Sequence, residues 1–137
     1  MNVLIDTNVI LDAVTGREPY NEHAEKLLLF ITEDKLKAFI TASSVMDIYY
    51  LLNKYLHNKE QVKQVLIKLF SEFEIIDVTR RDCEKAFSLT QNDFEDALLA
   101  TCAKRNKLDY IITRNLKDFT GSPVEAISPA DFLTNYF

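Results

Sequence analysis

Short runs rich in β-branched residues alternate along this chain with longer segments of helical periodicity. The strand-like runs are NVLI (2–5), KAFIT (37–41), FEIIDV (73–78), DYIIT (109–113) and VEAIS (124–128). Strands separated by helices predict right-handed crossovers and parallel pairing. We therefore expect an α/β fold, a three-layer sandwich with a mainly parallel, roughly five-stranded sheet flanked by helices.

The remaining periodic segments are expected to be helical. They span residues 8–14, 21–34, 43–56, 59–73, 80–90 and 92–106, with a last helical turn over 129–137. Gly16 suits the end of the first helix, and DIYYLL (47–52) is apolar nearly all round, which predicts a helix buried on several sides. No repeat or linker interrupts the pattern, so residues 1–137 are expected to form a single domain.

Composition excludes several classes of function. With only two glycines the chain has no phosphate-cradling loop, and its two histidines do not stand at zinc-ligand spacing. Cys83 and Cys102 are expected to be reduced. The net charge of −5 argues against a broad basic nucleic-acid surface, but not against a nucleic acid handled through metal ions. We find no signal peptide and no apolar run of ~20 residues, so a cytoplasmic protein without membrane contact is expected.

Acidic residues stand at several points that should meet at one edge of the sheet. Asp6 follows the first strand, Asp47 lies in the first turns after the second, Asp96 is near the start of 92–106, and Asp118 is in the turn after the fourth strand. Ligands bind at the carboxyl ends of parallel strands. Crowded carboxylates raise one another's pKa, and a divalent cation such as Mg²⁺ or Mn²⁺ removes that cost. The pattern predicts metal-dependent hydrolysis of phosphodiester bonds.

Each acid also has a simpler explanation. Asp6 could cap the following helix, Asp47 could be a solvated helix residue, and Asp118 could form a turn. Asp93 fits the first turn of a helix whose capping box is Asn92 and Glu95. Capping explains Asp96 least well, because the box is already supplied and a buried apolar run begins directly after it.

Polar side chains near these acids are candidates for orienting them or a metal-bound water. The supporting residues are Thr7, Asn8, Ser44, Asp93, Thr113 and Asn115. For Asn8 and Ser44, turn and cap chemistry is an equally good explanation. Asp12 is expected on the far side of the first helix, outside the site.

Taken in order, three segments resemble the PIN domain family over the whole chain. They are VLIDTNVILD, ITASSVMDIYYLL and DFEDALLATCAKRNKLDYIITRNLKDF. The resemblance implies a Mg²⁺- or Mn²⁺-dependent ribonuclease in which Asp6 and Asp96 match the first and third acids. Asp47 falls at the second acid, where Glu is more usual, and Asn115 or Asp118 fills the fourth place.

Many small members of that family are toxins of toxin–antitoxin pairs of the VapC type. The resemblance therefore implies an RNA substrate, a small antitoxin protein and a homodimer. Aromatic residues in DIYYLLNKYL and in the tail NYF also favour a dimer, although Tyr49 and Tyr50 could pack internally. The short side chain of Asp47 leaves open a catalytically weak or silent PIN-like module that binds RNA or protein.

A signalling receiver domain is a second alternative of similar size and fold class. Such a domain needs an acidic pair at the end of its first strand and an Asp after its third. Here the first strand ends in Asp6 alone, and Thr79 and Arg80 follow the third. The sequence therefore disfavours a receiver.

Overall fold

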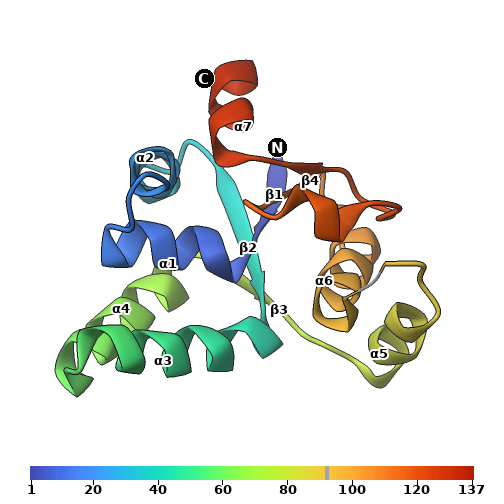
Figure 1. Cartoon of the computed structure of the whole chain (residues 1–137), viewed down its shortest axis with the longest axis horizontal. Helices are drawn as coiled ribbons and strands as arrows, with labels where there is room; N and C mark the ends of the chain where they lie inside the picture. Colours follow the sequence, from blue (N-terminus) through green and yellow to red (C-terminus); the bar gives the residue numbers. More distant parts are fainter. Residues whose placement is uncertain (92) are drawn as a thin grey trace.

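The computed structural model describes residues 1–91 and 93–137, which form a parallel sheet with helices on both faces (Figure 1). The sheet has five strands in the order β3-β2-β1-β4-β5, and every neighbouring pair is parallel. The strands are β1 (Asn2–Ile5), β2 (Lys37–Thr41), β3 (Glu74–Ile76), β4 (Tyr110–Ile112) and β5 (Ala126–Ile127). The predicted fold class is confirmed.

The helices follow the predicted segments with small changes at their ends. They are α1 (Thr7–Thr15), α2 (Asn21–Thr32), α3 (Ala42–Leu56), α4 (Lys59–Glu72), α5 (Arg80–Phe87), α6 (Phe94–Arg105), the 3₁₀ helix η1 (Leu116–Phe119) and α7 (Pro129–Tyr136). Gly16 ends α1 in the left-handed region at φ 65°, as expected. The last segment is a full helix rather than a turn. None of the described helices is long and apolar enough to cross a membrane.

The two faces of β1 belong to two separate hydrophobic cores. Val3 and Ile5 pack in the core that includes residues of α1, α2, α3, α4 and α7. Leu4 points into the other core, where Ala97, Ala100 and other small residues of α6 let that helix approach the sheet closely. Because α1 and α3 follow strands and α6 precedes one, all three helices begin at the carboxyl edge of the sheet.

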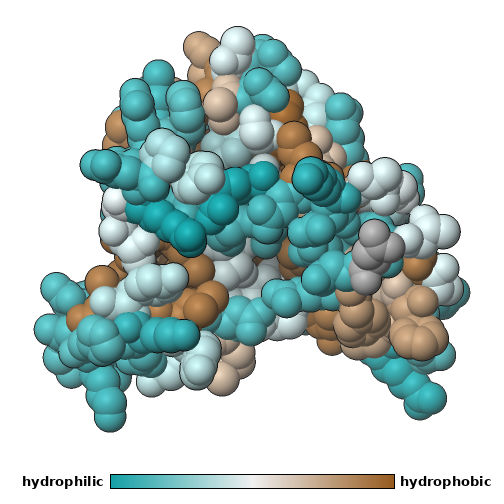
Figure 2. Space-filling model, viewed as in Figure 1, coloured by the Kyte–Doolittle hydropathy of each residue, from teal (hydrophilic) through white to brown (hydrophobic). Residues whose placement is uncertain are grey.

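Helix α3 buries only one of its faces. Ser44, Ile48 and Leu52 are buried, whereas Met46 and Tyr50 are both 67% exposed. The expectation that this helix is buried on several sides is wrong, and Tyr49 and Tyr50 do not pack internally. Neighbouring elements therefore cover one face of α3 and leave the opposite face exposed. Over the molecule as a whole, Figure 2 shows a surface that is mostly hydrophilic in this view.

Helix α5 is tied to α6 by a buried carboxylate. Asp82 closes a capping box with Thr79, and its two oxygens accept hydrogen bonds of 2.9 Å from Nε and Nη2 of Arg105. Burial opposes ionisation of Asp82, but the hydrogen bonds from Arg105 and Thr79 outweigh it and lower its pKa to about 2. Cys102 lies beside this pair, and both it and Cys83 are free thiols as expected.

We expect Asp82→Ala to lower the free energy of unfolding at pH 7 by about 3 kcal/mol, through loss of a buried ion pair and a helix cap. Because its folded-state pKa lies below the unfolded value, the carboxylate stabilises the wild type above about pH 4, and this contribution is lost as the pH falls towards 2. Urea titration at several pH values measures both effects.

The matched control is Glu84→Gln, which removes the exposed ion pair with Arg80 on the same helix. That variant should stay within about 0.5 kcal/mol of wild type. Equal stability of Asp82→Ala and wild type at pH 7 would contradict the assignment of Asp82.

Candidate active site at the carboxyl edge of the sheet

Asp6 is buried at the carboxyl end of the central strand, with 7% of its surface exposed. Its backbone N–H continues the sheet by donating to the Ile112 carbonyl at 3.0 Å. Its Oδ1 accepts a 2.7 Å hydrogen bond from the Thr7 N–H at the start of α1. Asp6 is therefore a helix cap, but capping uses only one of its two carboxylate oxygens.

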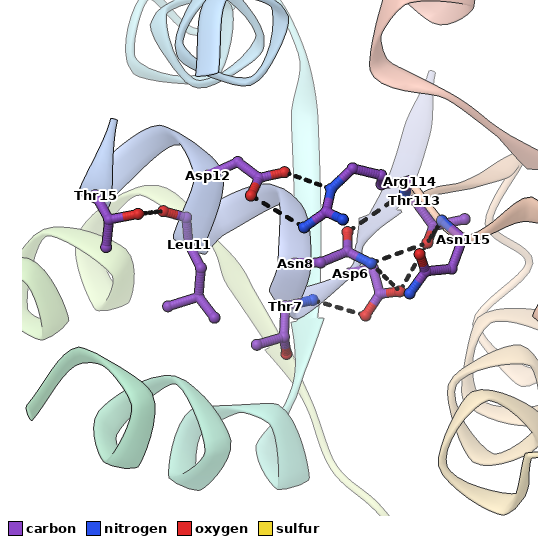
Figure 3. Close-up of polar contacts among 9 residues, drawn as sticks. All are labelled: Asp6, Thr7, Asn8, Leu11, Asp12, Thr15, Thr113, Arg114 and Asn115. Atoms are coloured by element: carbon purple, nitrogen blue, oxygen red, sulfur yellow. Dashed lines mark hydrogen bonds and ion pairs between the residues drawn. The ribbon is translucent and has the colours of Figure 1, made fainter. Parts of the chain in front are cut away.

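The second oxygen is held by residues of β4's carboxyl end and of α1 (Figure 3). The fully buried Thr113 hydroxyl donates to Oδ2 of Asp6 at 2.8 Å and accepts from the Asn115 N–H at 3.1 Å. Asn8 Nδ2 lies 3.4 Å from both Asp6 Oδ2 and Thr113 Oγ1. Of the proposed supporting residues, Thr113 and Asn8 contact Asp6 through their side chains and Thr7 through its backbone N–H. The Asn115 N–H reaches Asp6 only through the Thr113 hydroxyl.

Burial raises the pKa of Asp6 above its ordinary value. Hydrogen bonds from Thr113 and Thr7 lower it again, and the negative charge of Asp118 raises it. Gln91 fixes the turn that carries Asp118, because its Nε2 donates to the Asp118 carbonyl at 3.0 Å. The fourth acid predicted for this edge therefore lies close enough to act on Asp6.

The start of α6 brings more negative charge to the same place. Burial raises the pKa of Asp96 to about 7, and Asp6, Asp93 and Asp118 contribute by repulsion. Asp93 caps α6, since its Oδ1 accepts the Asp96 N–H at 3.0 Å. The expectation that Asp93 lies in the first turn is wrong, and Asn92, expected to form the capping box, lies outside the described residues.

Glu95 belongs to this acid cluster and was not among the predicted site residues. Burial raises its pKa to about 7, followed by a hydrogen bond with the Asp47 carboxyl group and repulsion from Asp47, Asp93 and Asp6. Glu95 is therefore close enough to interact electrostatically with Asp47 of α3, with Asp6 after β1 and with Asp93 at the start of α6. The sequence signal was the pair Glu95-Asp96, because neighbours on a helix diverge by only about 100° and both can face one edge.

The hydrogen bonds of Ser44 go to Thr41 rather than to the acid cluster. Its hydroxyl is 2.8 Å from that of Thr41, which caps α3 by accepting the Ser44 N–H at 3.2 Å. The structure therefore gives Ser44 the helix-cap chemistry that was its alternative explanation.

The acid cluster, formed by Asp6, Asp47, Asp93, Glu95, Asp96 and Asp118, offers only hard oxygen ligands, the type that Mg²⁺ and Mn²⁺ prefer. Protons shared among crowded carboxylates are what a divalent cation replaces, so the donor chemistry fits such an ion. Within the described residues, however, no three His, Cys, Asp or Glu side chains are placed to hold one ion as they stand. The residues that could hold it are Asp6, Asp47, Glu95 and Asp96.

Arg114 and Asp12 flank the acid cluster without joining it. Arg114 Nε lies 2.8 Å from Asp12 Oδ2, and its guanidinium stacks 4.2 Å from the ring centre of Tyr20. Asp12 is 2% exposed, and the expectation that it lies on the far side of α1 is wrong, because it faces Arg114, which follows Thr113 directly (Figure 3). Arg114 also lowers the pKa of Asp6 by its charge, so the Asp12–Arg114 pair fixes a turn next to the site.

Comparison with known proteins gives a consistent result. Residues 2–117 match the sequence profile described as PIN domain. A protein of Aquifex aeolicus (strain VF5) named VapC ribonuclease is 24% identical over 115 residues, which cover 80% of this chain and 84% of that protein.

Solved structures give the same picture of the fold. A toxin–antitoxin complex from Klebsiella pneumoniae contains a chain with 27% identity and a TM-score of 0.71, covering 93% of this chain and 97% of that one. VapBC2 from Rickettsia felis, bound to a DNA fragment from its promoter, contains one with 21% identity and a TM-score of 0.69, covering 93% and 98%.

We expect Thr113→Val to destabilise the protein by about 1–3 kcal/mol at pH 7, because it leaves one oxygen of the buried Asp6 carboxylate without its strongest donor. Chemical denaturation measures this loss. Thr134→Val, a change of the same kind at an exposed position of α7, should stay within about 0.5 kcal/mol of wild type. Equal losses in both variants would refute the special role of Thr113.

Proposed function

Because the chain belongs to the PIN domain family, we propose that it is a metal-dependent endoribonuclease and the toxin component of a toxin–antitoxin pair. The observation that carries this proposal is the convergence of acids from β1, α3, α6 and η1 at one edge of the sheet. Similarity to a protein named VapC ribonuclease and to a chain of a toxin–antitoxin complex supports it.

A Mg²⁺ or Mn²⁺ ion held by Asp6, Asp96 and the Asp47–Glu95 pair would supply a Lewis acid and a more acidic water for attack on a phosphodiester. Asp6 is prepared for such a role because α1 and Thr113 fix its carboxylate before any ligand arrives. The crowding that raises the pKa values of Asp96 and Glu95 to about 7 is a cost that a bound cation would remove. Asp118 adds negative charge at the rim.

Glu95 is relevant to the second acidic position of the family, where this chain has Asp47 and most members have Glu. The carboxyl group of Asp47 is close enough to raise the pKa of Glu95, so Glu95 is placed to supply the longer acid that Asp47 lacks. We propose that this pair together fills the second acidic position. A catalytically silent PIN-like binding module remains the second candidate, because no three described acids are placed to hold an ion as they stand.

The proposed partners are an RNA substrate, a small antitoxin protein and a second copy of the chain, in the cytoplasm. Chains of similar fold are found in the toxin–antitoxin complex from Klebsiella pneumoniae and in VapBC2 from Rickettsia felis. The open face of α3, formed by Met46, Tyr49 and Tyr50, supports the dimer, because these side chains are 38–67% exposed.

We expect the purified protein to cleave labelled RNA with Mn²⁺ or Mg²⁺, and to stop when EDTA removes the metal. Asp6→Asn and Asp96→Asn should each lower the cleavage rate by about 100-fold or more, because each removes a charged ligand. Asp34→Asn is the control, since Asp34 is exposed at the amino end of β2 and has φ 60°, where Asn is well tolerated.

Metal-independent cleavage, or full activity in Asp96→Asn, would contradict the proposal. Titration calorimetry separates the second candidate: absence of Mn²⁺ binding in the millimolar range, together with no cleavage, favours the silent module.

We expect a homodimer in light scattering, and Tyr50→Glu should shift it to a monomer by placing charge in an apolar contact. Leu29→Glu, at an apolar residue of α2 that is 52% exposed, should leave the dimer intact. A wild-type monomer at high protein concentration would rule out the dimer.

A further inference from the structure

A basic groove lies between α5 and α6, outside the acid cluster. Its volume is about 600 Å³. The cations that line it are Arg81 and Lys85 of α5 and Lys104 of α6, with Arg105 behind them. In Figure 1 the two helices lie together at the right of the molecule.

The groove has a local positive excess on a chain whose net charge is −5. Asp82 is the one carboxylate among the described residues that line it, and it is already neutralised by Arg105 at 2.9 Å. Arg81, Lys85 and Lys104 are exposed and have no carboxylate within 4.0 Å in the described part of the chain. These three charges are free to meet an anion.

The hydroxyl groups of the groove are already engaged by the helices. Ser88 Oγ donates to the Lys85 carbonyl at 2.7 Å, and Thr101 Oγ1 donates to the Ala97 carbonyl at 2.9 Å. Recognition therefore depends on three flexible cations rather than on a fixed set of donors. Such an arrangement suits a repeating phosphate backbone better than one shaped small molecule.

Two exposed aromatic residues belong to the same two helices without lining the groove. Phe87 at the end of α5 is 84% exposed, and Phe94 at the start of α6 is 49% exposed. Exposed aromatic rings are the groups on which single-stranded nucleic acids stack their bases. The acids of the cleavage site repel a polyanion, so attraction has to come from another part of the surface.

Helix α6 runs from the acid cluster to the α5–α6 groove. Asp96 lies in its first turn and Lys104 near its end, a separation of about 12 Å along the axis at 1.5 Å per residue. We propose that the α5–α6 groove binds the phosphate backbone of a single-stranded RNA substrate, on nucleotides away from the bond that is cut. This inference rests on the proposed ribonuclease function.

Fluorescence anisotropy of labelled single-stranded RNA, in EDTA and at several salt concentrations, tests the groove without cleavage. The variant is Lys85→Gln/Lys104→Gln, and the control is Lys26→Gln/Lys63→Gln, which removes the same charge from exposed positions of α2 and α4 on the other side of the sheet. The groove variant should bind on the order of tenfold more weakly, and its slope of log K against log salt should fall by about 1.4, or 0.7 per lost phosphate contact. The control should match wild type.

Equal affinity and slope in the groove variant and wild type would overturn the proposal, even if the protein cleaves RNA. Groove-dependent binding without any cleavage in Mn²⁺ would uphold the groove and refute the ribonuclease.

Two competitors identify other ligands. Displacement of RNA by inorganic phosphate beyond the effect of sodium chloride at equal ionic strength would make the groove a small-anion site. Tighter, lysine-dependent binding of polyglutamate would assign it to an acidic protein segment, and either result would overturn the proposal.

Discussion

Both oxygens of the Asp6 carboxylate are committed to hydrogen bonds at the end of the central strand, one from α1 and one from Thr113 after β4. These contacts join neighbouring strands of the sheet at the point where their chains leave it. They also hold a charge in a buried place, where desolvation would otherwise favour its protonated form. The other acids of the site gather around a group that the fold has already positioned.

The gathering of acids has an electrostatic cost that the rest of the structure partly relieves. Arg114 lowers the pKa of Asp6, and its own position is set by the buried Asp12 and the ring of Tyr20. For Asp96 and Glu95 the cost is not relieved, and burial and neighbouring carboxylates raise the pKa of each to about 7. A site with this surplus of negative charge suits a cation, and it needs help from elsewhere to attract RNA. The cations between α5 and α6 stand where they could give that help.

Several features of the site could be predicted from sequence because they depend on chain direction. Parallel strands end at one edge, so residues after β1 and β4 meet there, and Thr113 and Asn8 do contact Asp6. Glu95 was assigned to a cap because capping-box spacing is a local rule, whereas its partner Asp47 comes from a helix almost fifty positions away. The burial of α3 was overestimated for a similar reason: an apolar stretch does not reveal how many neighbours will cover it.

Periodicity and the handedness of crossovers were enough to predict the succession of strands and helices along the chain, the parallel sheet and the edge that carries the acids. The folded arrangement was needed to show which oxygens of Asp6 are occupied, that Glu95 lies close to Asp47, and that three lysine and arginine side chains share a groove whose one carboxylate among the described residues, Asp82, is bound by Arg105. Those outcomes depend on side-chain directions and burial between segments distant in sequence, which no local pattern encodes.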